Sequence, residues 1–196
     1  MLSKQALRDK LLSQRQSLSA GEIDLRSNKI YKNFLENHQT LLPQDYATAA
    51  LYFPIRGEVD TRLFFQFFKA RQKICLLPKV ESSELAFYPV RDWSELQLGK
   101  FGIGEPKPRT EEVSSVPDVV LVPGVAFSLS GHRLGYGAGF YDRAIKKWGL
   151  QAPQRTMRFL GLAYEMQIVQ ELPFEEHDRQ VDCVITEDRI FTGRRL

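Results

Sequence analysis

The chain has 196 residues and a formal net charge of +3, and 43% of its residues are hydrophobic and 26% charged. This balance is typical of a globular protein, and the length predicts a single domain spanning residues 1–196. The charge is mild and interleaved in sign, and no apolar run suits a signal peptide or a membrane span, so we expect a protein that binds neither nucleic acid nor membrane.

The first part of the chain predicts two helices followed by a strand, a helix and a strand. Leucines near one face predict a helix over 3–18, and Ser19 with Glu22 forms a capping box for a second helix running toward Asn37. The elements that follow are a strand over 47–53, a helix capped by Asp60 and Thr61, and a strand over 74–77 that ends at Pro78. A strand–helix–strand unit predicts parallel strands with a right-handed crossover.

The rest of the chain alternates strands with helical segments. The predicted strands are 84–90, 119–122, 159–163, 181–186 and a short edge piece over 190–192. The predicted helical segments are a turn within 92–98, a helix containing Tyr141 to Trp148, and a short helix over 166–172; the loops are 99–108, as a connector or a lid, and 173–179. The alternation predicts a three-layer α/β/α sandwich with a mostly parallel central sheet, in which ligands bind beyond the carboxyl ends of the strands.

The two cysteines predict buried thiols rather than a disulfide. Cys75 and Cys183 each lie within an apolar run, and the chain contains no C-x-x-C motif. We therefore expect a reducing, cytoplasmic setting. We also expect a monomer.

A glycine-rich stretch over 123–143, reading PGVAFSLSGHRLGYGAGFYDR, lies between the strand over 119–122 and the next helix. Glycine lets the backbone approach a ligand closely, and a helix N-terminus presents N–H groups that suit an anion such as phosphate. Arg133 adds a guanidinium, and Asp142 adds a carboxylate where a phosphate-bound Mg²⁺ could sit. From composition alone, the alternative is a mobile loop in which Arg133 and Asp142 form an exposed pair of little energetic value.

Two other polar features lie next to predicted strand ends. Glu58 follows the strand over 47–53, and a polar loop precedes the strand over 181–186. Their convergence with the glycine-rich stretch predicts a ligand site at one edge of the sheet. The alternative for Glu58 is a carboxylate favoured by a helix dipole, and Phe53 taken alone is better explained by core packing. The sequence offers no persuasive Ser-His-Asp or Cys-His set for nucleophilic catalysis.

The order of residues in the glycine-rich stretch closely resembles the signature of the 5-formyltetrahydrofolate cyclo-ligase family. Weaker matches occur in the family's order: KQALR over 4–8, LYFPIRGEVDT over 51–61, KFGIGEP over 100–106 and LPFEEHDRQVDCVITED over 172–188. The resemblance implies ATP-dependent cyclisation of 5-formyltetrahydrofolate, with or without a polyglutamate tail, to 5,10-methenyltetrahydrofolate. ADP and phosphate would be released, and Mg²⁺ would be the metal.

The resemblance also implies roles for individual residues. The ATP site would contain Lys4, Gln5, Ala6, Leu7, Arg8, Arg133, Leu134, Gly135, Tyr136, Gly137, Ala138, Gly139, Phe140 and Tyr141. The folate would contact Phe53, Glu58, Tyr136, Gly137, Ala138, Gly139 and Phe140. Asp142 and Asp178 would hold the metal, with Asp182 as a rival to Asp178. Arg133 and Glu58 would be the catalytic residues, Glu58 either binding the folate or helping to remove the N10 proton.

The implied chemistry suits these residue types. Phosphorylation of the formyl oxygen would create a leaving group, N10 would attack the carbon, and phosphate would depart. Phosphoryl transfer mainly needs positioning and neutralisation of charge. Two alternatives remain: a non-catalytic folate- or nucleotide-binding module, and a sugar-phosphate isomerase-like enzyme in which Glu58 and Asp142 would be a weak acid/base pair.

Overall fold

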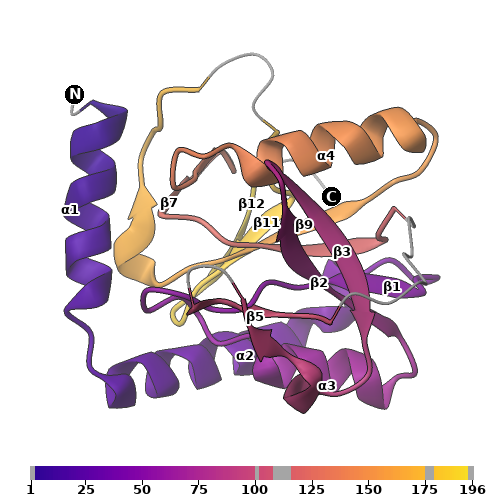
Figure 1. Cartoon of the computed structure of the whole chain (residues 1–196). Coiled ribbons are helices and arrows are strands. Elements are labelled where there is room, and N and C mark those ends of the chain that lie inside the picture. Colours follow the sequence, from indigo (N-terminus) through magenta and orange to yellow (C-terminus); the bar gives the residue numbers. More distant parts are fainter. Residues whose placement is uncertain (1–2, 100–101, 108–115, 175–178, 194–196) are drawn as a thin grey trace.

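The computed structural model in Figure 1 describes residues 3–99, 102–107, 116–174 and 179–193. Its centre is a seven-stranded sheet with the order β12-β11-β9-β6-β1-β2-β3. These strands are β1 (Thr48–Ala50), β2 (Ile74–Glu81), β3 (Glu84–Val90), β6 (Val119–Val122), β9 (Arg158–Leu162), β11 (Cys183–Ile185) and β12 (Ile190–Thr192). The inner strands pair in parallel, and β3 and β12 pair antiparallel at the two edges, which confirms the mostly parallel sheet.

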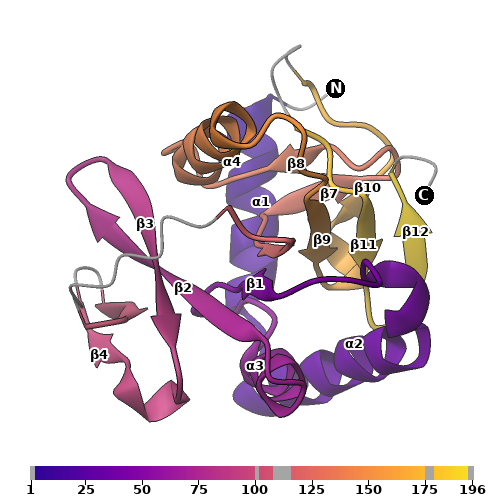
Figure 2. The same ribbon diagram turned by 90° about the vertical axis from the view of Figure 1, so that its right-hand side faces the viewer.

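Helices cover both faces of this sheet, which confirms the three-layer arrangement. α2 (Ala20–Leu41) and α3 (Arg62–Ala70) lie on one face and α4 (Phe140–Gln151) on the other, as Figures 1 and 2 show. α2 continues about one turn past the predicted end near Asn37. The core on the first face includes the phenylalanines of α3, and the core on the second face includes Trp148 of α4.

The apolar run of β6 is explained by burial on both faces. Val119 and Leu121 belong to the core beneath α2 and α3, whereas Val120 and Val122 belong to the core beneath α4. Successive side chains of a strand point to opposite faces, so an inner parallel strand needs apolar residues at every position.

A second sheet, with the order β10-β7-β8, departs from the prediction. The glycine-rich stretch, in which no strand was predicted, contributes β7 (Ala126–Ser128) and β8 (Arg133–Leu134). The predicted helix over 166–172 is wrong beyond a short helical turn, η3 (Glu165–Gln167), because the chain there pairs with β7 as β10 (Ile168–Val169). α1 (Lys4–Gln16) packs against this second sheet through Leu11.

Strand β2 does not end at Pro78 but runs through it. β1 pairs with β2 only at its start, and Pro78 lies opposite Phe87 of β3. The amide of Val80, two residues on, points away from β3 toward Glu105, and alternate N–H groups of a strand point to the same side. The nitrogen of Pro78 therefore faces a side where no neighbouring strand in the described part of the chain offers an acceptor. No hydrogen bond of the sheet is lost, which is why a proline is tolerated there.

The start of α3 also differs in detail from the prediction. The Thr61 hydroxyl does not cap the helix but donates to the Tyr52 carbonyl oxygen at 2.7 Å. The Asp60 carboxylate accepts the Arg62 backbone N–H at 2.8 Å instead. Thr61 is fully buried, so its hydroxyl ties the end of the chain after β1 to the helix.

The capping box at the start of α2 is confirmed. The Ser19 hydroxyl accepts the Glu22 N–H at 3.3 Å, and the Glu22 carboxylate accepts the Ser19 N–H at 2.9 Å. The hydrogen bond from the Ser19 backbone is the main cause that lowers the pKa of Glu22 below its usual value of 4.5. The carboxylate's contribution to stability is therefore present above that value and is lost as the pH falls through the lowered pKa.

Replacing Ser19 by alanine is expected to lower the free energy of unfolding by about 1 kcal/mol, because the Glu22 N–H loses its acceptor and the Glu22 carboxylate loses the hydroxyl that donates to it. Urea denaturation at neutral pH measures the change. Ser13→Ala, on the exposed face of α1, is the matched control and should cause no loss. Equal stabilities for Ser19→Ala and the unchanged chain would contradict this role.

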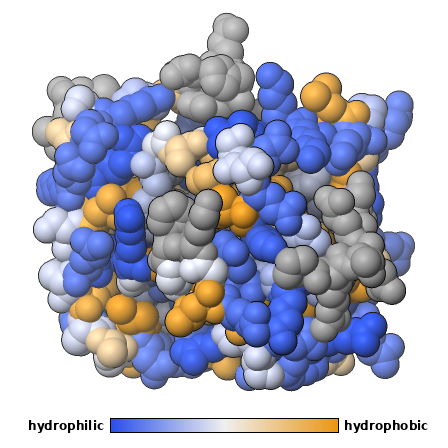
Figure 3. Space-filling view, in the orientation of Figure 1, coloured by the Kyte–Doolittle hydropathy of each residue, from blue (hydrophilic) through white to orange (hydrophobic). Residues whose placement is uncertain are grey.

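Both cysteines are buried free thiols, as predicted. Burial raises the pKa of each to about 12, so neither thiol ionises readily at neutral pH. Among the residues that the structure describes, no helix is both long and apolar enough to cross a membrane. The face in Figure 3 is largely hydrophilic, with hydrophobic residues in small separate groups.

Candidate active site

A cavity of about 520 Å³ opens beyond the carboxyl ends of β1 and β6, where the sequence predicts a ligand site. Its walls come from α1, the segment after β1, the β2–β3 hairpin, residues 103–105 and the run 133–142. Figure 2 shows how the β2–β3 hairpin extends beyond the rest of the sheet. The volume suits a small organic ligand.

The glycine-rich stretch forms one wall of this cavity and leads directly into α4. Gly137 and Gly139 have φ angles of 100° and 67°, in the left-handed region that glycine occupies without strain. Gly139 is the residue before α4, and a Cβ there would lie 2.9 Å from Nη1 of Arg143. The first N–H groups of a helix have no intrahelical acceptor, so the wall formed by Phe140, Tyr141 and Asp142 offers donors to an anion.

Arg133 reaches this wall from β8. Its Nη2 donates to Oδ1 of Asp142 at 2.5 Å, and its Nη1 donates to the Pro123 carbonyl oxygen at 3.4 Å. Only 7% of the Arg133 side chain is exposed, compared with 47% for Asp142. The alternative of two exposed partners is therefore wrong for Arg133, whose charge lies inside the cavity wall.

Of the five residues predicted from α1, Lys4 and Arg8 line the cavity. Nε of Arg8 donates to the Gly135 carbonyl oxygen at 2.9 Å, which joins α1 to the glycine-rich stretch. Gln5, Ala6 and Leu7 lie outside the lining: the Gln5 side chain accepts a hydrogen bond from Arg8 at 2.8 Å, and Leu7 packs in the core under α1. Helical geometry explains the split, because residues four apart share a face.

Glu58 also lines the cavity and is 6% exposed. Its Oε1 accepts the Tyr136 hydroxyl at 2.6 Å, and its Oε2 accepts the Ile55 N–H at 2.9 Å. Burial raises the pKa of Glu58 above its usual value, and the charge of Arg15 is the largest opposing cause. A carboxylate with a raised pKa is a stronger base than an exposed one.

Arg15 is a residue that sequence reasoning missed. It lies within α1 and is 1% exposed, and it donates to the Tyr136 hydroxyl oxygen. Tyr136 thus connects Arg15 to Glu58, while its own ring lines the cavity. A charged residue in an otherwise ordinary amphipathic helix gave no signal of this burial.

The rest of the cavity wall is mainly apolar. Phe53 stacks on Trp93 at 5.7 Å between ring centres, and Gly104 lies so close to Phe53 that a Cβ there would be 2.4 Å from its ring. Leu85 of the hairpin and Ile103 continue this wall. The 99–108 segment, predicted as a connector or a lid, therefore contributes to the cavity in its described part.

Two further carboxylates differ from the sequence predictions: Glu105, which the sequence did not single out, and Asp182, which it named as a rival metal ligand. Glu105 lines the cavity, is 8% exposed and accepts the Val80 N–H at 3.4 Å. Asp182, the rival metal ligand, instead accepts the Phe159 N–H at 2.7 Å and is not part of the lining. Asp178 lies outside the described residues, so its role stays a prediction.

The tyrosine at the start of α4 places a polar atom inside the wall. The Tyr141 hydroxyl is buried and has no hydrogen-bond partner within the described ranges. Burial is the main cause that raises the pKa of this hydroxyl, so it is a neutral group at physiological pH. A ligand in the cavity would provide the partner that a buried hydroxyl normally has.

Comparisons with known proteins show which family this chain resembles. The model of the 5-formyltetrahydrofolate cyclo-ligase family matches residues 1–187. The 5-formyltetrahydrofolate cyclo-ligase of Escherichia coli K12 is 34% identical over 149 residues, covering 74% of this chain and 80% of that protein. The structure of Aquifex aeolicus 5,10-methenyltetrahydrofolate synthetase has a TM-score of 0.81 at 36% identity, covering 100% of this chain and 95% of that chain. A synthetase of the same name from Mycoplasma pneumoniae has a TM-score of 0.70 at 30% identity, with 95% and 99% covered.

Proposed function

Since the chain belongs to the 5-formyltetrahydrofolate cyclo-ligase family, we propose that the cavity described above is where its two substrates meet. The chain catalyses the ATP-dependent cyclisation of 5-formyltetrahydrofolate to 5,10-methenyltetrahydrofolate, with release of ADP and phosphate. The observation that supports the placement is that cationic side chains, helix N–H groups, a buried carboxylate and an apolar wall all line this cavity.

The γ-phosphoryl group is transferred to the formyl oxygen of the substrate, which turns a poor leaving group into phosphate. N10 then attacks the formyl carbon, the N10 proton leaves, and the carbon–oxygen bond breaks as phosphate departs. The charge that has to be neutralised lies on the phosphate oxygens. Arg133 and the N–H groups at the start of α4 are the donors placed for it.

The triphosphate lies along the glycine-rich stretch, with α1 on its outer side. Gly137 and Gly139 leave room for close approach, and Lys4 and Arg8 supply charge from α1. Arg8 also fixes this helix to the stretch through the Gly135 carbonyl. ATP would therefore contact two segments that are distant in the sequence and already joined by this hydrogen bond.

The folate lies against the apolar wall. The flat pterin packs near Phe53 and the hairpin residue Leu85, and Glu105 can accept N–H groups from its aminopyrimidine edge. Glu58 faces the same space and accepts the N10 proton as the new carbon–nitrogen bond forms. Glu58 is suited to this step because its pKa is raised by burial.

A magnesium ion would accompany the triphosphate and neutralise charge on its oxygens. Within the described parts of the chain, no group of three or more His, Cys, Asp or Glu side chains could hold a metal by itself. Mg²⁺ usually takes one or two carboxylates and completes its shell with phosphate and water. Asp142, half-exposed at the cavity wall, fits that requirement, and Asp178 is the predicted second ligand.

The overall proposal is tested by mixing the protein with MgATP and 5-formyltetrahydrofolate. We expect the near-UV absorbance of the methenyl product to appear together with ADP, and a metal chelator to stop the reaction. Ligand-induced thermal stabilisation without ATP consumption would instead indicate a binding module. Turnover of a sugar phosphate without ATP would indicate an isomerase.

Arg8→Met is expected to raise the KM for ATP about tenfold, because a charge-assisted contact near the triphosphate is lost. Initial rates at varied ATP and saturating folate measure this change. Lys10→Met is the matched control, since Lys10 is exposed on the same helix and does not line the cavity. Equal KM values for the two variants would remove Arg8 from the ATP site.

A further inference from the structure

The charged side chain of Arg15 is buried, at a position where an apolar side chain would lose less hydration free energy. Its Nε donates to the Arg56 carbonyl oxygen at 3.1 Å and its Nη1 to the Gly124 carbonyl oxygen at 3.0 Å. Its Nη2 donates to the Tyr136 hydroxyl. Burying a charge costs several kcal/mol unless its partners compensate for the lost water. These three contacts connect α1 to residues that are separated from Arg15 by 41, 109 and 121 positions in the sequence.

The direction of each hydrogen bond follows from the chemistry of the groups. A guanidinium can only donate, so the Tyr136 oxygen accepts from Arg15 and its hydroxyl proton points to Glu58. The second oxygen of Glu58 accepts the Ile55 N–H. Both oxygens of Glu58 therefore act as acceptors, which is the arrangement that an ionised carboxylate requires.

We infer that Arg15 is a positioning residue, which acts through the Tyr136 hydroxyl to hold Glu58 as an ionised and oriented carboxylate at the cavity wall. This inference rests on the proposed function, in which Glu58 accepts the N10 proton. Arg15 does not itself line the cavity, so it touches neither substrate. Its effect reaches the reaction through one hydroxyl group.

The groups that face Glu58 come from every element packed around it. Arg15 projects from α1, Arg56 lies in the turn after β1, and the three tyrosines nearby are Tyr52, Tyr136 and Tyr141. The tyrosine hydroxyls are neutral, because burial is the main cause that raises the pKa of each above its usual value. Arg15 and Arg56 are therefore the cations that oppose protonation of Glu58, and Arg15 is the stronger cause.

Arg15→Met removes the charge and keeps much of the side-chain length. We expect the acid limb of kcat/KM, where activity falls as Glu58 becomes protonated, to move to higher pH by about 1–3 units. Arg15→Lys keeps a charge but not the forked donors, so it should restore part of that shift. Binding of ATP should change little, which separates this effect from general disruption of the cavity.

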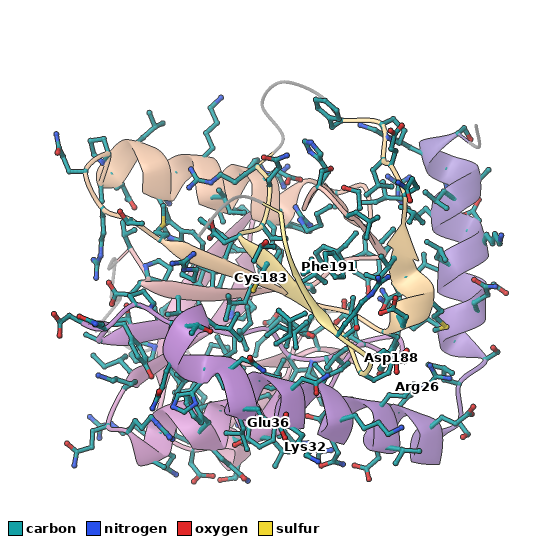
Figure 4. All side chains as sticks on the ribbon, turned by 180° about the vertical axis from the view of Figure 1, so that it is seen from behind. Arg26, Lys32, Glu36, Cys183, Asp188 and Phe191 are labelled. Carbon is teal, nitrogen blue, oxygen red and sulfur yellow. The ribbon has the colours of Figure 1, made fainter. Side chains whose placement is uncertain are left out.

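The pKa of Glu58 can be measured without turnover, from its carboxyl infrared band in the substrate-free protein, assigned by its loss in Glu58→Gln. We expect the same upward shift in Arg15→Met. Arg26→Met is the matched control: Arg26 lies on α2, pairs with Glu187 at 2.6 Å and is 34% exposed. Figure 4 shows Arg26 on the rear face of the molecule, and its loss should leave the acid limb unchanged.

An unchanged pKa of Glu58 in a folded Arg15→Met variant would overturn the inference and leave Arg15 a structural residue. If that variant fails to fold, Tyr136→Phe decides the matter, because it keeps the guanidinium with both backbone carbonyl partners and removes only the linking hydroxyl. In Tyr136→Phe, the acid limb of kcat/KM and the pKa of Glu58 measured from its infrared band must also move to higher pH. The absence of both shifts would overturn the inference. Absence of cyclo-ligase turnover in the unchanged protein would instead refute the proposed function, while the infrared result would still decide the role of Arg15.

Discussion

Replacing Glu58 by glutamine is expected to lower kcat by about 10²–10⁴-fold, the usual contribution of a general base. Glutamine keeps the size of the side chain and can still accept a hydrogen bond, so substrate binding should be largely retained. What is lost is the ability to take the N10 proton when the carbon–nitrogen bond forms. Single-turnover formation of the methenyl product at saturating substrates measures this step directly.

The pH dependence provides the stronger test of that role. The base has to be ionised, so kcat/KM should fall as the pH falls through the pKa of Glu58 in the folded protein. Because burial raises this pKa, the fall should begin above the usual value of 4.5. The limb should be absent in Glu58→Gln. A near-normal kcat in Glu58→Gln would show that Glu58 only binds the folate. An acid limb of kcat/KM that is unchanged in this variant would show that another group causes the fall in activity.

Replacing Arg133 by alanine is expected to slow turnover by about 10²–10³-fold while the fold stays intact. Arg133 is held at the cavity wall by contacts to Asp142 and to the Pro123 carbonyl, so its guanidinium is oriented before ATP binds. That orientation makes its charge effective against the charge developing on the transferred phosphoryl group. Rapid-quench measurement of ADP formation reports the step.

Arg155→Ala is a suitable control for the loss of a paired arginine. Arg155 contacts Asp118 at 2.6 Å. Asp118 immediately precedes β6, so it lies at the amino end of that strand, whereas the cavity lies beyond the carboxyl end. This variant should lose some stability and keep its turnover number. Arg133→Ala with near-normal turnover would show that the guanidinium does not neutralise the transferred group, and Arg133→Lys should recover part of the rate if it does.

The site was only partly predictable from the sequence. The glycine-rich stretch was recognisable because glycines next to a helix start, an arginine and an aspartate are local features. Glu58 could be placed beside it because the carboxyl ends of parallel strands meet at one edge of a sheet, whereas Phe53 was placed there only by the family resemblance. The burial of Arg15 was not predictable, because its partners Gly124 and Tyr136 are more than 100 positions away.

By itself, the sequence determined those parts of the protein that depend on neighbouring residues: the capping box at Ser19, the apolar run of β6 and the strand–helix alternation that produces the α/β/α layers. Local hydrogen bonding and the period of apolar residues are enough to specify such elements. Only the tertiary structure decided that the 168–169 segment pairs as a strand, that β2 passes through Pro78, and that a buried arginine supports Glu58. Each of these features depends on a segment that is distant in the sequence and is brought near by folding. That segment provides the hydrogen-bond partners without which burying these backbone groups or this charge would be costly.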